Sequence, residues 1–213
     1  ESYRHELDAS TIMELAIGYL WAFEYQSAWE HLCDAMKEYP HTISTFFGMA
    51  GVAKWCLEER SAAVEQWRIG LDSQFDDGAG GTTLPLLLFF AAIVQKDVSL
   101  QLEAESILSE RALSPFARNW PGPIANYVLG QTDENQLPIL CKANRKVETD
   151  LNKWLIDFYV GVMELRRGNT VRYKDLMHRV SDTKRIEWQD EMFFFGAAWS
   201  EEFFLARHVS LSK

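Results

Sequence analysis

Apolar residues recur every three or four positions along most of this chain, whereas alternation at every second position is weak. The three-four spacing is typical of helices that bury one face, and alternation would have indicated strands. Proline and glycine lie mainly between the periodic segments, where they end helices. The pattern predicts an all-α fold with helices at 8–23, 26–38, 43–57, 60–72, 83–95, 98–112, 121–129, 133–143, 147–167, 170–181 and 187–208.

The first predicted helical hairpin returns 35 positions later in the sequence. Small side chains in such a hairpin let two helices pack closely, because the residues at the contact set the distance between the helix axes. A period of this length indicates stacked helical repeats, an architecture whose surfaces mostly bind proteins or peptides. The corresponding positions are Ala16 and Gly51, Ala28 and Ala63, Leu32 and Trp67, and Ala35 and Gly70.

We expect a single domain over residues 1–213, built from stacked hairpins. Its parts are hairpins at about 8–40, 43–72, 83–112 and 147–181, an insertion at 113–146 and an aromatic terminal helix at 187–208.

Several local signals refine these boundaries. Asp8, Ser10 and Ser61 are predicted near helix starts, and Pro40 is predicted to close the first hairpin. The acidic and glycine-rich stretch at 76–81 is predicted to be a flexible loop, since it offers too few ligands for calcium and would repel phosphate.

A separate signal marks the insertion. Two prolines bracket Gly122, so no helix can run through residues 120–123. This stretch is predicted to form a structural corner with Trp120 anchored in the core.

The hairpin at 8–40 resembles a tetratricopeptide (TPR) repeat well, those at 43–72 and 147–181 resemble it less closely, and the one at 83–112 resembles it least. This resemblance implies a TPR-like right-handed solenoid with an aromatic C-terminal capping helix. The stretch Trp120-Pro121-Gly122-Pro123, the next hairpin and the terminal helix are similar to NlpI-like bacterial TPR lipoproteins. That similarity implies a bacterial adaptor, often at the cell envelope, although this chain lacks the N-terminal cysteine that those proteins lipidate.

Charge is distributed unevenly along the chain, whose formal net charge is -10. Residues 1–80 hold 14 acidic and 5 basic side chains, whereas residues 142–186 hold 6 acidic and 11 basic ones. An acidic first half disfavours nucleic acid as a partner and suits a basic protein or peptide. The alternative is that these charges only keep helix faces solvated. The candidate protein-binding residues are Glu24, Glu30, Asp34, Glu38, Glu58, Glu59, Glu65, Trp21 and Trp55.

The inner face of the predicted stack is apolar, which is unusual for a water-filled groove. Three explanations remain open: the lining is core, the terminal helix or a second subunit of a homodimer covers it, or a partner's apolar segment binds there. The lining residues are Met13, Ile17, Trp21, Val52, Trp55, Phe89, Ile93, Phe158 and Val162.

No catalytic, cofactor or metal motif is evident in the sequence. His31, Cys33 and His41 are spaced poorly for zinc, and Cys141 has cationic neighbours but no evident base. Within each of the acid pairs Glu58-Glu59 and Glu201-Glu202, the two side chains would point in different directions on a helix. The three cysteines are expected to be free thiols.

The most apolar run, at 84–94, is too short to span a bilayer. The sequence given begins at Glu1, so it does not decide whether a leader was removed. It also does not decide between a cytoplasmic and a periplasmic location.

The preferred function is therefore a non-enzymatic protein-interaction module or adaptor. An immunity or inhibitor protein that neutralises a basic toxin is the first alternative, because charge complementarity would support it. A hydrolase on an α/α scaffold is the second.

Overall fold

The computed structural model describes residues 9–38, 44–73, 79–144, 150–181 and 204–208. The regular structure in these ranges is helical, and none of the described residues forms a β-strand, which confirms the predicted all-α class. The helices are α1 (Ala9–Trp21), α2 (Tyr25–Glu38), α3 (Ser44–Cys56), α4 (Arg60–Gly70), α5 (Thr83–Gln95), α6 (Val98–Ala112), α7 (Gly122–Val128), α8 (Leu137–Asn144), α9 (Asp150–Arg166), α10 (Thr170–Ser181), the 3₁₀ helices η1 (Pro115–Arg118) and η2 (Glu134–Gln136), and a short helix at 204–208.

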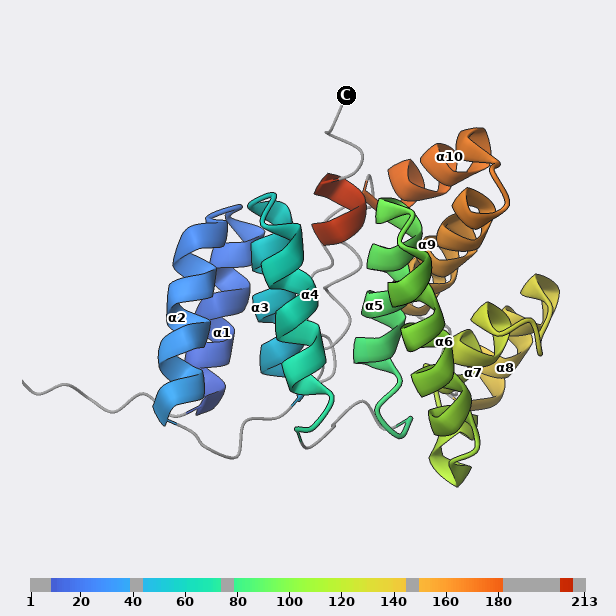
Figure 1. Ribbon diagram of the computed structural model, residues 1–213, viewed down its shortest axis with the longest axis horizontal. Coiled ribbons are helices and arrows are strands. Elements are labelled where there is room, and N and C mark those ends of the chain that lie inside the picture. The colour runs from blue at the N-terminus through green and yellow to red at the C-terminus, as the bar shows by residue number, and fades with distance from the viewer. Residues whose placement is uncertain (1–8, 39–43, 74–78, 145–149, 182–203, 209–213) are drawn as a thin grey trace, which may run out of the picture.

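Helices that follow one another in the chain pack as hairpins (Figure 1). The pairs are α1 with α2, α3 with α4, α5 with α6, and α9 with α10. Neighbouring hairpins also contact each other, because α2 packs on α3, α4 on α5, and α5 on α9. The helices α7 and α8 lie between the third and fourth hairpins in the sequence; α7 contacts α6 and α9, and α8 contacts α7 and α9.

Small residues lie where the helices of a hairpin cross, as the repeat predicted. Ala28 and Ala63 are completely buried at corresponding positions. At Gly51 a methyl group would collide with the ring of Trp67, and at Gly161 it would collide with Met177. The indole nitrogen of Trp67 donates to the carbonyl oxygen of Gly48 at 3.0 Å, so the ring is fixed against α3. The crossing is close because α3 carries no side chain at that point.

A row of aromatic rings connects the second, third and fourth hairpins. Trp55 stacks on Trp67 with ring centroids 5.8 Å apart, and its other neighbour is Phe90 of α5 at 5.1 Å. Phe90 in turn lies 5.2 Å from Phe158 of α9. Ring pairs at such distances add stability beyond the area that they bury. The core is therefore continuous from α4 to α9.

Each hairpin turn contains a residue in the left-handed backbone region. These residues are Phe23 (φ 62°), Glu58 (φ 63°), Lys96 (φ 57°) and Gly168 (φ 82°). The first two are 35 positions apart, so they occupy the same place in the repeat. Glycine is the residue that this conformation favours, and a bulky aromatic such as Phe23 is an outlier in it.

Some local predictions need correction. Ser10, a predicted N-cap, lies inside α1, whereas Ser61 is the second residue of α4 and so lies at the start of that helix as predicted. The N-cap of α4 is Glu59, which makes no side-chain capping bond. A side-chain cap is found where none was predicted: Asp97 accepts a hydrogen bond from the Leu100 amide at 3.0 Å and begins α6. Asp8 and Pro40 lie outside the described residues, as does most of the predicted terminal helix at 187–208.

The predicted corner at residues 120–123 is confirmed. Trp120 is 3% exposed, the peptide bond that links it to Pro121 is cis, and α7 begins at Gly122. The carbonyl of Ala117 in η1 leaves no room for a side chain at Gly122. The backbone of η1 and the buried Trp120 ring therefore direct the chain into α7.

Removing the Trp120 ring should destabilise the fold. We expect Trp120→Ala to lower the free energy of unfolding by about 3–5 kcal/mol, the usual range for a buried aromatic. The matched control is Phe116→Ala, because Phe116 lies in the same corner but is 59% exposed, and its effect should stay within about 0.5 kcal/mol. Urea denaturation monitored by circular dichroism measures both. Equal effects of the two substitutions would contradict the anchoring role of Trp120.

Candidate protein-interaction surface

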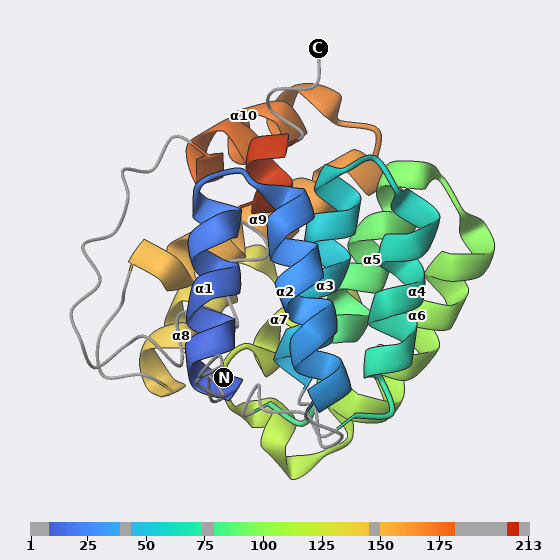
Figure 2. The ribbon, with the colours of Figure 1, turned by 90° about the vertical axis from the view of Figure 1, so that its left-hand side faces the viewer.

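The second helix, α2, presents a polar stripe to solvent. Its inner side is formed by Ala28, Leu32 and Ala35, which are completely buried. Its outer side carries Gln26, Glu30, Asp34 and Lys37, all exposed and spaced by three or four residues. We call these four residues the α2 stripe. Figure 2 shows that α1 and α2 together form one end of the molecule.

The acids of this region are only weakly neutralised by their neighbours. Glu30 accepts a hydrogen bond from the neutral Gln26 amide at 2.8 Å, and Glu24 accepts one from the Ser27 hydroxyl at 3.4 Å. Asp34 pairs with Lys37 at 3.1 Å, but both side chains are more than 70% exposed, and such pairs add little stability. Among the described residues, Lys37 is the only basic residue of α1 and α2 besides His31.

The other predicted acids differ in their surroundings. Glu65 is exposed on α4. Glu58 pairs with His208 at 2.7 Å and with Arg60 at 3.0 Å, and Glu59 pairs with Lys54 at 2.8 Å. The hydrogen bond from His208 lowers the pKa of Glu58, and Arg60 adds to the effect. Glu38 belongs to α2, but its side chain lies outside what the structure describes.

The two predicted tryptophans are not alike. Trp55 is 1% exposed and belongs to the aromatic row, so it has no surface to offer a partner. Trp21 is partly buried and meets the ring of Phe204 edge-on at 5.0 Å. The rest of the predicted apolar lining is buried and belongs to the hydrophobic core: Met13, Ile17, Val52, Phe89, Ile93, Phe158 and Val162.

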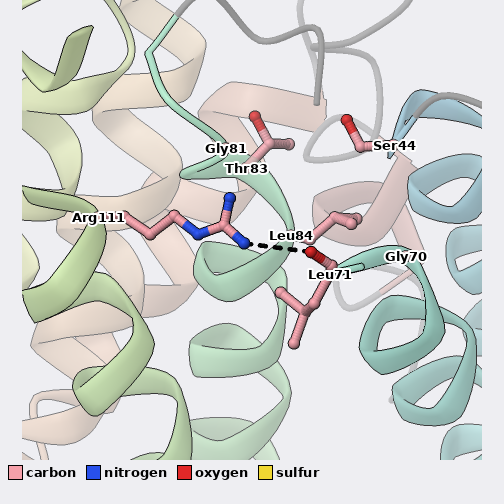
Figure 3. A pocket seen from close by; sticks show the side chains of 7 residues that line it. All are labelled: Ser44, Gly70, Leu71, Gly81, Thr83, Leu84 and Arg111. Atoms are coloured by element: carbon pink, nitrogen blue, oxygen red, sulfur yellow. Dashed lines mark hydrogen bonds between the residues drawn. The ribbon is translucent and has the colours of Figure 1, made fainter. Parts of the chain in front are cut away.

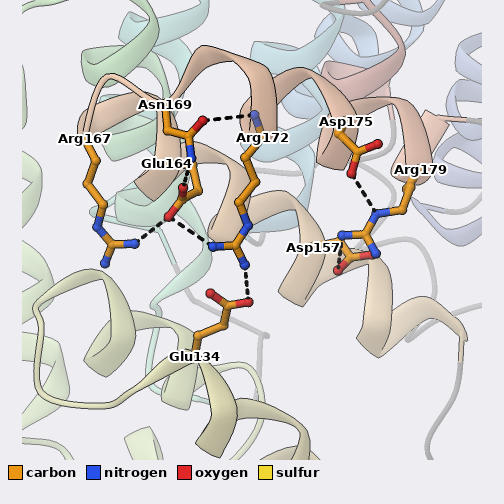
Figure 4. Close-up of polar contacts among 8 residues, drawn as sticks. All are labelled: Glu134, Asp157, Glu164, Arg167, Asn169, Arg172, Asp175 and Arg179. Atoms are coloured by element: carbon orange, nitrogen blue, oxygen red, sulfur yellow. Dashed lines mark hydrogen bonds and ion pairs between the residues drawn. The ribbon is translucent and has the colours of Figure 1, made fainter.

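In the described part of the basic stretch, Arg167, Arg172 and Arg179 pair with acids of the same molecule (Figure 4). Arg167 pairs with Glu164 at 2.7 Å, Arg172 pairs with Glu134 at 2.6 Å and Glu164 at 3.4 Å, and Arg179 approaches Asp157 at 3.5 Å. These pairs join α9, α10 and the 3₁₀ helix η2. The arginines of α9 and α10 thus hold the fourth hairpin together, whereas the acids of α2 face solvent.

Glu164 is the centre of that network and was not predicted from the sequence. Its residue is 5% exposed, and its second carboxylate oxygen accepts from the side-chain amide of Asn169 at 2.7 Å. Burial alone would raise the pKa of Glu164, but the hydrogen bonds from Arg167 and Asn169 outweigh it and lower the pKa. The network therefore favours the charged carboxylate.

A shallow pocket lies between the starts of α3 and α5 (Figure 3). Arg111 is its one charged lining residue, and its guanidinium donates to the carbonyl oxygens of Leu71 at 3.2 Å and Gly80 at 3.3 Å. The space open to the centres of water molecules is about 10 Å³, enough for a single water. The described lining residues offer no paired acid and base.

His31 and the three cysteines, the described residues that could have formed a metal or thiol site, have ordinary protein surroundings. The Nδ1 atom of His31 lies 2.9 Å from the carbonyl oxygen of Ser27, and its ring packs on Tyr19 at 4.7 Å. His41 lies outside the described residues. All three cysteines are free thiols, and burial raises the pKa of Cys56 to about 12. In the part of the chain that the structure describes, no three potential ligands gather around a metal position.

Comparisons of this chain with protein-family models, with curated proteins and with solved structures give no match. No described helix is both long enough and apolar enough to cross a membrane.

Replacing Glu164 by Gln should show how much the charged network contributes. The substitution keeps the shape but removes the charge, so we expect a loss of about 1–3 kcal/mol in the free energy of unfolding at neutral pH. The control Asp175→Asn removes an exposed charge 3.8 Å from Arg179 and should change stability by less than about 0.5 kcal/mol.

The pH dependence of this difference has a definite sign. Because the pKa of Glu164 is lower in the folded state, its contribution is complete above the unfolded pKa of about 4.3 and is lost as pH falls through the folded pKa. The difference between Glu164→Gln and the unsubstituted protein should therefore shrink in acid. Urea denaturation between pH 7 and pH 3 measures it, and a constant difference would argue against a charged Glu164.

Proposed function

We propose that this protein is a non-enzymatic interaction module that captures a basic protein or peptide through the α2 stripe. The observation that carries the proposal is the contrast between two charged regions. Glu30 and Asp34 face solvent with little neutralisation, whereas the arginines of α9 and α10 are paired with acids of the same molecule. Solvated acids on a rigid helix form a field that attracts a basic surface.

The charge on α2 acts mainly on the rate of association. Charges at the rim of an interface steer the encounter of two proteins, and salt screens this effect over about 8 Å at 0.15 M. The same reasoning covers the alternative of an inhibitor that neutralises a basic toxin, since such a protein would use the same surface. The identity of the partner separates the adaptor from the inhibitor.

For the architecture, we propose a TPR-like right-handed solenoid related to NlpI-like bacterial adaptors. The support is the repeat itself: Phe23 and Glu58 share a left-handed backbone conformation 35 positions apart. Ala28 and Ala63, at the same spacing, are both completely buried. Two features at equivalent positions indicate that the first two hairpins are copies of one unit.

The test compares two sets of charge reversals. The first reverses three acids spaced by four residues on α2, Glu30→Lys, Asp34→Lys and Glu38→Lys. The control reverses three exposed acids elsewhere, Asp72→Lys, Glu110→Lys and Asp133→Lys, and changes the net charge equally. Partners retained by the unsubstituted protein are identified by mass spectrometry, and the association rate of the purified partner is then measured by surface plasmon resonance.

We expect the α2 reversals to slow association by about tenfold or more at low salt, because steering supplies factors of that size. The control set should retain most of the rate, and the difference should fade above about 0.15 M salt. An equal loss with both sets would show that only net charge matters. An unchanged rate with the α2 set would reject this surface.

A further inference from the structure

The short helix at 204–208 lies at the edge of the molecule formed by the hairpin turns (Figure 1, red). Its residues Phe204, Leu205 and Ala206 are completely buried. Three of the side chains that it contacts belong to the first two hairpins, which precede it by about 150 residues or more. This five-residue helix is therefore held largely by side-chain contacts with distant parts of the chain.

Three of these contacts pair one residue of the helix with one residue at or beside a turn. Phe204 meets Trp21 edge-on, with the ring centroids 5.0 Å apart. The Arg207 guanidinium lies over the ring of Phe23, 4.1 Å from its centroid, a distance suited to a cation–π interaction. We call Trp21, Phe23 and Glu58 the seat.

The third contact pairs an imidazole of the helix with an acid of the seat. The Nε2 atom of His208 lies 2.7 Å from a carboxylate oxygen of Glu58. The seat thus offers two aromatic rings and an acid, and the helix supplies an aromatic ring, a guanidinium and an imidazole in matching order.

The two turn residues of the seat are strained in their backbone, in a conformation that the other two hairpin turns share. Phe23 and Glu58 both adopt positive φ, although neither is glycine. Non-glycine residues in this conformation are strained, and such strain persists mainly where a side chain has a role. At both turns the strained residue is the one that contacts the 204–208 helix. Lys96 has the same conformation in the third hairpin and is exposed.

We propose that the seat is a binding site for the 204–208 helix as a separable ligand, and that a second copy of this chain can supply that helix in trans. An identical helix from another copy would make the same contacts, which makes exchange of such an element a low-cost route to a dimer. Within one copy the helix has a high effective concentration, so it occupies its own seat unless that contact is weakened. This site is separate from the α2 stripe and does not depend on the function proposed for it.

The test uses two full-length variants with complementary defects. In the seat variant, Phe23→Gly and Glu58→Gly remove two of the three contacts while relieving the backbone strain, so the fold should be retained. In the helix variant, Arg207→Glu and His208→Ala change two partly exposed residues. Like copies of either variant can make only one of the three contacts, whereas the mixture combines an intact seat with an intact helix.

We expect each variant alone to be monomeric and their equimolar mixture to form a heterodimer in native mass spectrometry and light scattering. A mixture that stays monomeric, while circular dichroism shows both variants folded, would overturn the proposal. If the helix variant does not fold, His208→Ala alone replaces it, since that change removes only the contact with Glu58. Lys96→Gly, which relieves strain in a turn outside the seat, should not substitute for the seat variant in the mixture.

A labelled peptide with the sequence of residues 200–213 provides a second measurement. Its fluorescence anisotropy should show binding to the helix variant at least about tenfold tighter than to a protein that also carries the seat substitutions, since tenfold corresponds to about 1.4 kcal/mol. Equal binding to both proteins would overturn the proposal. The α2 reversals should not change this binding, so failure here and failure of the α2 interface are distinguishable.

Discussion

The close crossing of α3 and α4 is the contact on which the rest of the structure depends. Trp67 lies against α3 where Gly51 has no side chain, and its indole nitrogen is bonded to the carbonyl of Gly48. That position brings the Trp67 ring onto Trp55, from which the aromatic row continues to Phe90 and Phe158. A larger residue at Gly51 would move the first ring of a row that links three hairpins. Close-packed protein interiors transmit such displacements from one side chain to the next.

The second hairpin also supports the two surfaces that we connect with binding. The crossing of α3 and α4 sets the position of the turn that contains Glu58, and α3 in turn supports α2 through their contact. The acids of α2 and the seat are therefore presented by a rigid frame. At the other end of the molecule, Glu164 and the arginines form a closed network that stabilises the fourth hairpin. In the function that we propose, charge at one end of the molecule supports recognition, whereas at the other end it stabilises the fourth hairpin.

Much of the fold could be predicted because its signals are local or periodic. The repeat matched Ala16 with Gly51 and Ala28 with Ala63, and the predicted helix ends agree with the structure within a few residues over the described ranges. The two prolines around Gly122 predicted the corner, since their effect on the backbone is local. By contrast, the pairing of Arg172 with Glu134 and of His208 with Glu58 joins residues 38 and 150 positions apart. No spacing in the sequence marks such partners, so the network and the seat emerged only from the structure. Trp55 was predicted at a surface because the pattern could not distinguish a groove from a core.

The most direct test of this account compares alanine at two glycines within helices. Gly51→Ala and Gly18→Ala both gain about 1 kcal/mol of helix propensity, but a methyl group at Gly18 would meet nothing within 4 Å. Equilibrium urea unfolding should show Gly18→Ala neutral or stabilised, and Gly51→Ala destabilised by about 1–3 kcal/mol because Trp67 must move. Equal stabilisation by the two substitutions would contradict the account, since α3 and α4 would then cross without needing a glycine.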